Sequence, residues 1–260
     1  MRSLCAPFIP LHRCWIWGWC LALAALFGCA VPVSPAANST PTLSPRLALA
    51  FAYFQNGQYR VALDESRKVL ETQPNEPQAL GLQGLIYARL NEPALAERSF
   101  LRAEQVAAQD ADLAHNHGLF LCEQNQFPAS FERFGRAVQQ PLYADKSKTF
   151  WVWGVCAQKS GDETTAQSLW VQSLALKPSA EAALALAQSY QQQMRSVRAN
   201  EVLNTINSTP AATPETLWLG IQWARKNADE VALKRYAVQL QKRFPTSSQW
   251  DAFQREAYDD

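Results

Sequence analysis

The side chains whose types and spacing could support chemistry in this chain are two cysteines and two histidines. Cys122 and Cys156 lie 34 positions apart, and thiols held close together form a disulfide in an oxidising compartment. His115 and His117 lie two positions apart, so on a helix they point to different faces and cannot share a metal ion. The sequence therefore favours structural chemistry and indicates no metal site.

Catalytic motifs are absent from the sequence. It contains no nucleophile elbow, no glycine loop of the kind that binds phosphate and no His-Glu pair at metal-binding spacing. The carboxylates are scattered along the chain, as is usual for a solvated surface. We therefore expect neither an enzyme nor a cofactor.

The elements that must position the cysteines and histidines are marked by small residues that return about every 34 positions. One series is Ala50, Gly84, Gly118, Gly154, Ala187 and Gly220, and a second, twelve residues later, is Ala62, Ala96, Ser130, Ala166, Ala199 and Ala232. Helices that cross closely need small residues where they touch. A pair of such positions at this period predicts a stacked array of helix–turn–helix units.

The other repeat positions fit the same interpretation. Four residues after the second small position the side chain is usually large, as in Phe100, Phe134 and Trp170. Turn residues separate the two helices of a unit: Asn56-Gly57, Asn91, Asn125, Ser160-Gly161-Asp162 and Lys226-Asn227. This pattern resembles the tetratricopeptide repeat (TPR). Pro93 and Met194 depart from the usual turn residues of such repeats and leave the helix boundaries near them open.

The expected fold is all-α, a right-handed superhelical solenoid of about six TPR helix pairs, because no alternating apolar run predicts a strand. The repeats are expected at about 43–76, 77–110, 111–146, 147–179, 180–212 and 213–246, followed by a C-terminal tail that completes a domain over 43–260. Two extra residues within 140–145 should lengthen the connection between repeats 3 and 4.

Residues 1–28 have the organisation of a secretion signal, with charged residues before an apolar run over 15–27. The segment ends in Leu26-Phe27-Gly28-Cys29, which resembles the lipobox of bacterial lipoproteins. The resemblance implies cleavage before Cys29, acylation of Cys29 and, because Ala30 follows, sorting to the outer membrane with the repeats in the periplasm. The alternatives are an ordinary signal or a short membrane helix with a chance cysteine, although the run is short for spanning.

Residues 29–42 are rich in Pro, Ser, Ala and Thr and carry no charge. Such a segment cannot bury enough apolar surface to fold and is expected to be a flexible tether. From Cys29 to Asp260 the chain has 22 Lys and Arg against 23 Asp and Glu. Near neutrality argues against nucleic-acid binding, which needs a basic surface.

The repeat places Cys122 and Cys156 near the ends of the first helices of repeats 3 and 4. These helices are neighbours in a TPR stack, so a disulfide would join the array across its irregular connection. Two independent buried thiols are the alternative, because cysteine is among the most buried residues.

In the TPR fold the first helix of each pair lines a concave face. The residues expected to bind a partner there are Phe51, Phe54, Leu85, His115 and Leu119, with Leu47 and Cys122 at equivalent positions. Gly81 and Ala88 would leave a hollow opposite the phenylalanines. This groove would suit an apolar peptide or helix, unless Phe51 and Phe54 pack on the next repeat instead.

Several segments together resemble the PilF/PilW family of type IV pilus biogenesis lipoproteins. They are the lipobox, Leu119-Phe120-Leu121-Cys122, Pro141-Leu142-Tyr143, Gly154-Val155-Cys156-Ala157, Glu215 to Ile221 and Arg243-Phe244-Pro245. The resemblance implies a pilotin, which carries the pilus secretin subunit to the outer membrane with the lipoprotein-sorting machinery and promotes its multimerisation. The alternatives are a TPR lipoprotein scaffold for cell-wall synthesis or outer-membrane protein assembly, and an enzyme, for which no nucleophile–base spacing is present.

Overall fold

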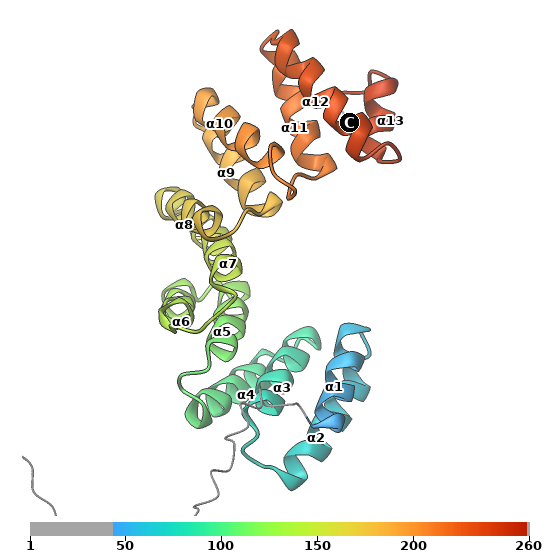
Figure 1. Ribbon diagram of the computed structural model, residues 1–260. Helices are drawn as coiled ribbons and strands as arrows, with labels where there is room; N and C mark the ends of the chain where they lie inside the picture. Colours follow the sequence, from blue (N-terminus) through green and yellow to red (C-terminus); the bar gives the residue numbers. More distant parts are fainter. Residues whose placement is uncertain (1–43, 259–260) are drawn as a thin grey trace, which may run out of the picture. The chain divides into compact units, whose positions relative to one another are not determined.

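The computed structural model describes residues 44–258, and within them every regular element is a helix (Figure 1). The all-α TPR fold is therefore confirmed. The helices are α1 (Pro45–Gln55), α2 (Tyr59–Thr72), α3 (Pro77–Arg89), α4 (Pro93–Val106), α5 (Ala111–Glu123), α6 (Phe127–Gln139), α7 (Lys146–Lys159), α8 (Glu163–Leu176), α9 (Ala180–Gln192), α10 (Ser196–Asn207), α11 (Pro214–Lys226), α12 (Glu230–Arg243) and α13 (Ser248–Gln254).

The helices form pairs that stack in chain order. Each odd-numbered helix from α1 to α11 packs on the helix that follows it, and it also contacts the first helix of the next pair. No second helix, from α2 to α12, contacts another second helix within the described residues. The first helices are thus drawn together on one side of the stack, and the residues they present there can converge on a common surface.

The small residues of the repeat allow this close approach. A Cβ added at Gly154 would lie 2.4 Å from Nε1 of Trp170, and one added at Gly84 would lie 2.8 Å from the ring of Phe100. Both rings are fully buried between the helices of their pair. The same match of a glycine with a ring sixteen residues later joins Gly118 to Phe134 and Gly220 to Tyr236. The predicted role of these positions is confirmed.

The turn residues adopt the backbone conformation that their types favour. Positive φ angles occur at Gly57 (72°), Asn91 (59°), Asn125 (59°) and Gly161 (88°), where glycine and asparagine are tolerated best. In pair 5 this position is Met194, with φ 57°. In pair 6 it is Ala228 (53°), so the sequence-based placement of that turn at Lys226-Asn227 was one residue early. Pro93 begins α4, where its missing N–H costs nothing.

The C-terminal tail is more ordered than the repeat pattern predicts. It forms α13, and Tyr258 then stacks on Trp218 of α11 with ring centroids 5.8 Å apart. The guanidinium of Arg225 lies 3.8 Å from the centre of the Tyr258 ring, a distance at which a cation attracts an aromatic face. The tail therefore covers apolar surface of the last helix pair.

The secretion signal, Cys29 and the tether fall outside the described residues. None of the helices between residues 44 and 258 has the length and apolar character needed to cross a membrane.

Candidate functional site

Three first helices, α1, α3 and α5, converge on a pocket of about 360 Å³. Phe51, Leu85 and His115, each expected from the sequence to bind a partner, come from these three helices and all line it. The remaining lining residues are Gln78, Gly81, Leu82, Asp110, Asp112, Leu113, Asn116, Tyr143, Asp145 and Lys148. We call this hollow the α1–α3–α5 pocket.

Other residues expected in the groove lie elsewhere. Phe54 packs beside Tyr59, with ring centroids 5.7 Å apart, and Leu119 packs against the cluster around Cys122 and Phe134. Leu47 is only 1% exposed and belongs to the core between α1, α2 and α3. Its assignment to the groove was wrong, because the next helix pair covers it.

Gly81 does not open a hollow opposite the phenylalanines in the way that the sequence suggested. A Cβ at this position would lie 2.3 Å from Cδ2 of Leu113. The missing side chain therefore admits Leu113 from α5 rather than a partner. Both residues line the pocket.

The half of the pocket nearest α5 and α7 is polar, and the sequence did not predict it. Asp110 and Asp112 stand at the start of α5, while Tyr143 and Asp145 come from the lengthened connection between α6 and α7. Burial, together with the charges of Asp110 and Asp145, raises the pKa of Asp112. Burial also raises the pKa of Tyr143 to about 12, so this phenol stays protonated.

His115 is neutral in this setting. Its ring is 5% exposed, and burial, reinforced by the nearby charge of Lys148, lowers its pKa to about 4. Nδ1 lies 2.8 Å from Oγ1 of Thr149. That hydroxyl also lies 3.0 Å from the hydroxyl of Tyr143 and 3.3 Å from the carbonyl oxygen of Asp145. Thr149 thus links His115 to the connection before α7, and either ring nitrogen of the neutral imidazole can carry the proton in this arrangement.

Replacing His115 by glutamine is expected to remove a component of acid sensitivity. Between pH 6.5 and about 4 the unfolded chain protonates this histidine and the folded chain does not, so stability falls as pH falls through that window. The component amounts to about 3 kcal/mol by pH 4. Urea unfolding at pH 7.5 and at pH 4.5 measures it. Equal losses in wild type and His115→Gln would contradict a neutral buried His115.

A buried network of charged side chains surrounds His117, the second histidine of α5. His117 is fully buried and lies 3.0 Å from Glu104 and 3.3 Å from Glu97, with its ring stacked on Phe100. Burial opposes ionisation of Glu104, but the hydrogen bond from His117 and the charges of His117, Arg133 and Arg136 outweigh it and lower the pKa. His117 thus joins helix pairs 2 and 3, and it takes no part in the pocket.

A disulfide joins Cys122 at the end of α5 to Cys156 of α7, with Cα atoms 5.9 Å apart. Both residues are buried, and Phe134 packs against them. The bond spans the connection that carries the extra residues. It therefore fixes α5 against α7, the two helices that supply His115 and its partner Thr149.

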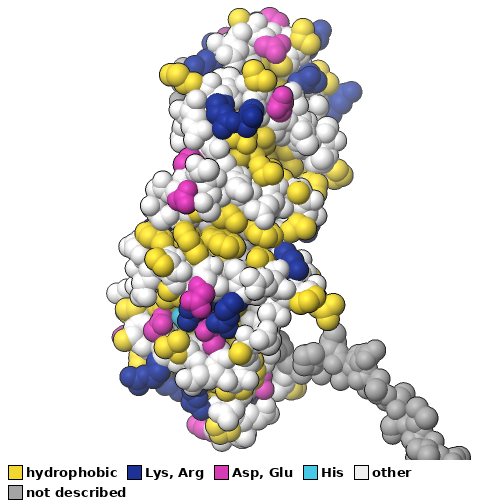
Figure 2. Space-filling model, turned by 90° about the vertical axis from the view of Figure 1, so that its left-hand side faces the viewer, with side chains coloured by type: hydrophobic (Ala, Val, Ile, Leu, Met, Phe, Trp, Pro, Cys, Tyr) yellow, Lys and Arg dark blue, Asp and Glu magenta, His cyan; other side chains and the backbone are white. Residues whose placement is uncertain are grey.

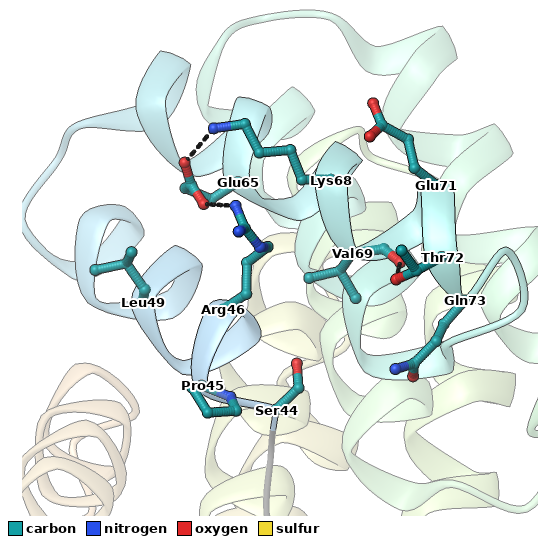
Figure 3. Close-up of a pocket in the computed structure, with 10 residues that line it drawn as sticks. All are labelled: Ser44, Pro45, Arg46, Leu49, Glu65, Lys68, Val69, Glu71, Thr72 and Gln73. Carbon is teal, nitrogen blue, oxygen red and sulfur yellow. Dashed lines mark hydrogen bonds and ion pairs between the residues drawn. The ribbon is translucent and has the colours of Figure 1, made fainter.

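A larger hollow, about 860 Å³, lies at the start of the stack between α1 and α2 (Figure 3). An ion-paired row stands along one side of it, with Glu65 2.8 Å from Arg46 and 2.6 Å from Lys68. These groups are satisfied by one another, and the hollow receives none of the converging first helices after α1. We therefore take the α1–α3–α5 pocket as the candidate site despite its smaller volume.

Figure 2 shows one face, on which a partly covered histidine lies among acidic and basic groups, below a band of hydrophobic side chains. Groups of three or more His, Cys, Asp or Glu side chains that could hold a metal ion are not found in residues 44–258.

Comparison with known proteins identifies proteins that are similar to this chain. No protein-family model matches it. It is 26% identical over 211 residues to the type IV pilus assembly protein PilF of Pseudomonas aeruginosa, covering 81% of this chain and 84% of that protein. A solved structure of P. aeruginosa PilF superposes with a TM-score of 0.64 at 25% identity, covering 81% of this chain and 96% of the other. The chain is homologous to PilF.

The structural comparison extends to PilW, a widely conserved type IV pilus biogenesis factor. Its crystal structure matches with a TM-score of 0.61 and 25% identity, over 80% of this chain and 96% of PilW. The resemblance to the PilF/PilW proteins is thus confirmed. MamA matches with a TM-score of 0.53 at 16% identity, over 61% of this chain and 92% of MamA, and shows the repeat fold alone.

Proposed function

We propose that this protein is an outer-membrane lipoprotein that acts in type IV pilus biogenesis as a pilotin. In this role it binds the pilus secretin subunit and promotes the secretin's localisation and multimerisation at the outer membrane. Homology to PilF supports the pilus role, and the lipobox ending at Cys29 supports the anchor. The α1–α3–α5 pocket is the feature through which the secretin would be held.

The observation that carries the proposal is the convergence of Phe51, Leu85 and His115 from three separate helix pairs on one hollow. Phe51 and Leu85 are only partly buried and are free to pack against an incoming side chain. A groove with anchors spaced along parallel helices suits a short extended or helical segment. A tether to the membrane would raise the concentration of the bound secretin near the site of assembly.

Replacing both Phe51 and Leu85 by aspartate is expected to abolish secretin capture. Two carboxylates placed in the apolar wall would face a partner's apolar side chain without compensation, which should weaken binding at least about tenfold. The measurement is a pull-down from detergent-solubilised membranes with the full chain as bait, followed by detection of the secretin.

The matched control is Leu49→Asp/Leu101→Asp, which adds the same charges at exposed leucines of α1 and α4 outside the pocket. It should capture the secretin as well as wild type does. If wild type instead brings down cell-wall synthesis or outer-membrane assembly components and no secretin, the pilotin function is wrong and the scaffold function replaces it.

A further inference from the structure

The polar half of the α1–α3–α5 pocket contains carboxylates that form no ion pair with the rest of the described chain. Three carboxylates line it, those of Asp110, Asp112 and Asp145, against the single cation of Lys148. None of these four residues forms an ion pair within residues 44–258. Lys148 can offset one of the three charges, so the site retains an excess of negative charge.

Only one of these carboxylates caps a helix. Asp110 caps α5 by accepting a hydrogen bond from the backbone N–H of Leu113 at 3.0 Å. Asp145 precedes α7 without forming a side-chain cap bond. Burial and the charges of Asp110 and Asp145 oppose ionisation of Asp112 and raise its pKa. A cation that entered the pocket beside Asp112 and Asp145 would favour the ionised form of Asp112.

His115 adds a second, independent feature that calls for a polar group on the ligand. The residue is more than nine-tenths buried and lines the pocket. Nδ1 lies against Thr149, whereas Nε2 forms no hydrogen bond within the described residues. Nε2 is therefore available to a ligand, as an acceptor or as a donor according to the tautomer. A peptide backbone supplies both a donor and an acceptor.

The opposite wall fixes the rest of the ligand. Phe51 on α1 and Leu85 on α3 are the partly exposed apolar side chains that line the pocket, and the carboxylates come from α5 and from the connection before α7. At about 360 Å³ the hollow is near the lower end of the range for ligand pockets. It would hold a few side chains of a peptide segment rather than the face of a long helix.

We propose that the occupant of the α1–α3–α5 pocket is a short peptide segment in which an apolar side chain is followed closely by a lysine or arginine. The apolar side chain packs on Phe51 and Leu85, the cation lies between Asp112 and Asp145, and a backbone polar group of the segment forms a hydrogen bond with Nε2 of His115. This inference rests on the proposed function in taking the pocket as the partner-binding groove. It adds the chemistry by which the bound segment is chosen.

The test begins with a selection that assumes no partner. A library of random twelve-residue peptides displayed on phage is selected against the full-length protein in detergent, and bound sequences are compared with the unselected library. The expected result is enrichment of an apolar residue with Lys or Arg within about four positions of it. Enrichment of uncharged or acidic sequences would overturn the inference.

The selected peptide is then measured by fluorescence anisotropy against two variants. Asp112→Asn/Asp145→Asn should bind it about tenfold more weakly, which corresponds to about 1.4 kcal/mol. The control, Glu71→Gln/Glu201→Gln, removes two exposed carboxylates outside the pocket and should change affinity less than about twofold. Equal effects of the two variants would show that only the overall charge matters and would overturn the inference.

A second peptide, with glutamine in place of its basic residue, completes a double-mutant cycle. It should bind wild type about tenfold more weakly and should not distinguish Asp112→Asn/Asp145→Asn from wild type. The secretin pull-down is run with the same variants. If the basic peptide binds as expected but no secretin is captured, the inference stands and the pilotin function fails. If the secretin is captured equally by wild type and Asp112→Asn/Asp145→Asn, the inference fails and the pilotin function stands.

Discussion

Replacing Trp170 by alanine is expected to lower the free energy of unfolding by about 4 kcal/mol. The indole is fully buried between α7 and α8, where it fills the space that Gly154 leaves open, and Nε1 donates to the carbonyl of Trp151 at 3.2 Å. Truncation removes this packing and leaves a cavity that the neighbouring helices cannot close without moving toward each other. The helices α7 and α8 would lose the main side chain that packs between them.

Chemical denaturation of the fragment 43–260 measures the effect. Leu176→Ala is the matched control, because this leucine belongs to the same helix but is 56% exposed, and its loss should cost less than about 1 kcal/mol. Since a repeat array is stabilised mainly by neighbouring pairs, the transition of the Trp170 variant should also broaden or split. A loss below about 1 kcal/mol for Trp170→Ala would show that the layer is not close-packed.

Removing the disulfide by Cys122→Ala/Cys156→Ala is expected to cost a similar amount, about 4 kcal/mol. The bond closes a loop with a sequence separation of 34, and the chain-entropy estimate for a loop of that length gives this value. The fragment 43–260 contains no other cysteine, so its response to reductant reports on this bond alone.

Wild type measured with and without dithiothreitol supplies the control. Reductant should lower the stability of wild type toward that of the double variant, and it should not change the variant itself. If reductant did not change the stability of wild type, Cys122 and Cys156 would be two independent buried thiols.

The repeat architecture could be predicted because its determinants are local in sequence. In four of the helix pairs a glycine packs against an aromatic ring sixteen positions later, as Gly84 does against Phe100, so the contact in space follows from the period along the chain. The same periodicity predicted that Phe51 and Leu85 lie on the same side of the stack. This prediction did not depend on the conformation of the connecting loops.

Periodicity does not predict which contacts the side chains of irregular segments make. Tyr143 and Asp145 line the pocket from the connection between α6 and α7, and no repeat position describes them. Tyr258 is held by a stacking partner and a cation from α11, which are tertiary contacts. Leu47 occupies a groove position in the pattern, but the first pair has the next pair packed over that position.

The bond between Cys122 and Cys156 also sets how far this chain can be drawn out under mechanical load. The residues between the two cysteines, α6 among them, would contribute about 110 Å of contour length if fully extended. With the disulfide closed, tension applied to the two ends bypasses this segment and runs through a covalent link from α5 to α7. Under such load the helices outside residues 122–156 can extend the chain, whereas the residues between the two cysteines cannot lengthen it.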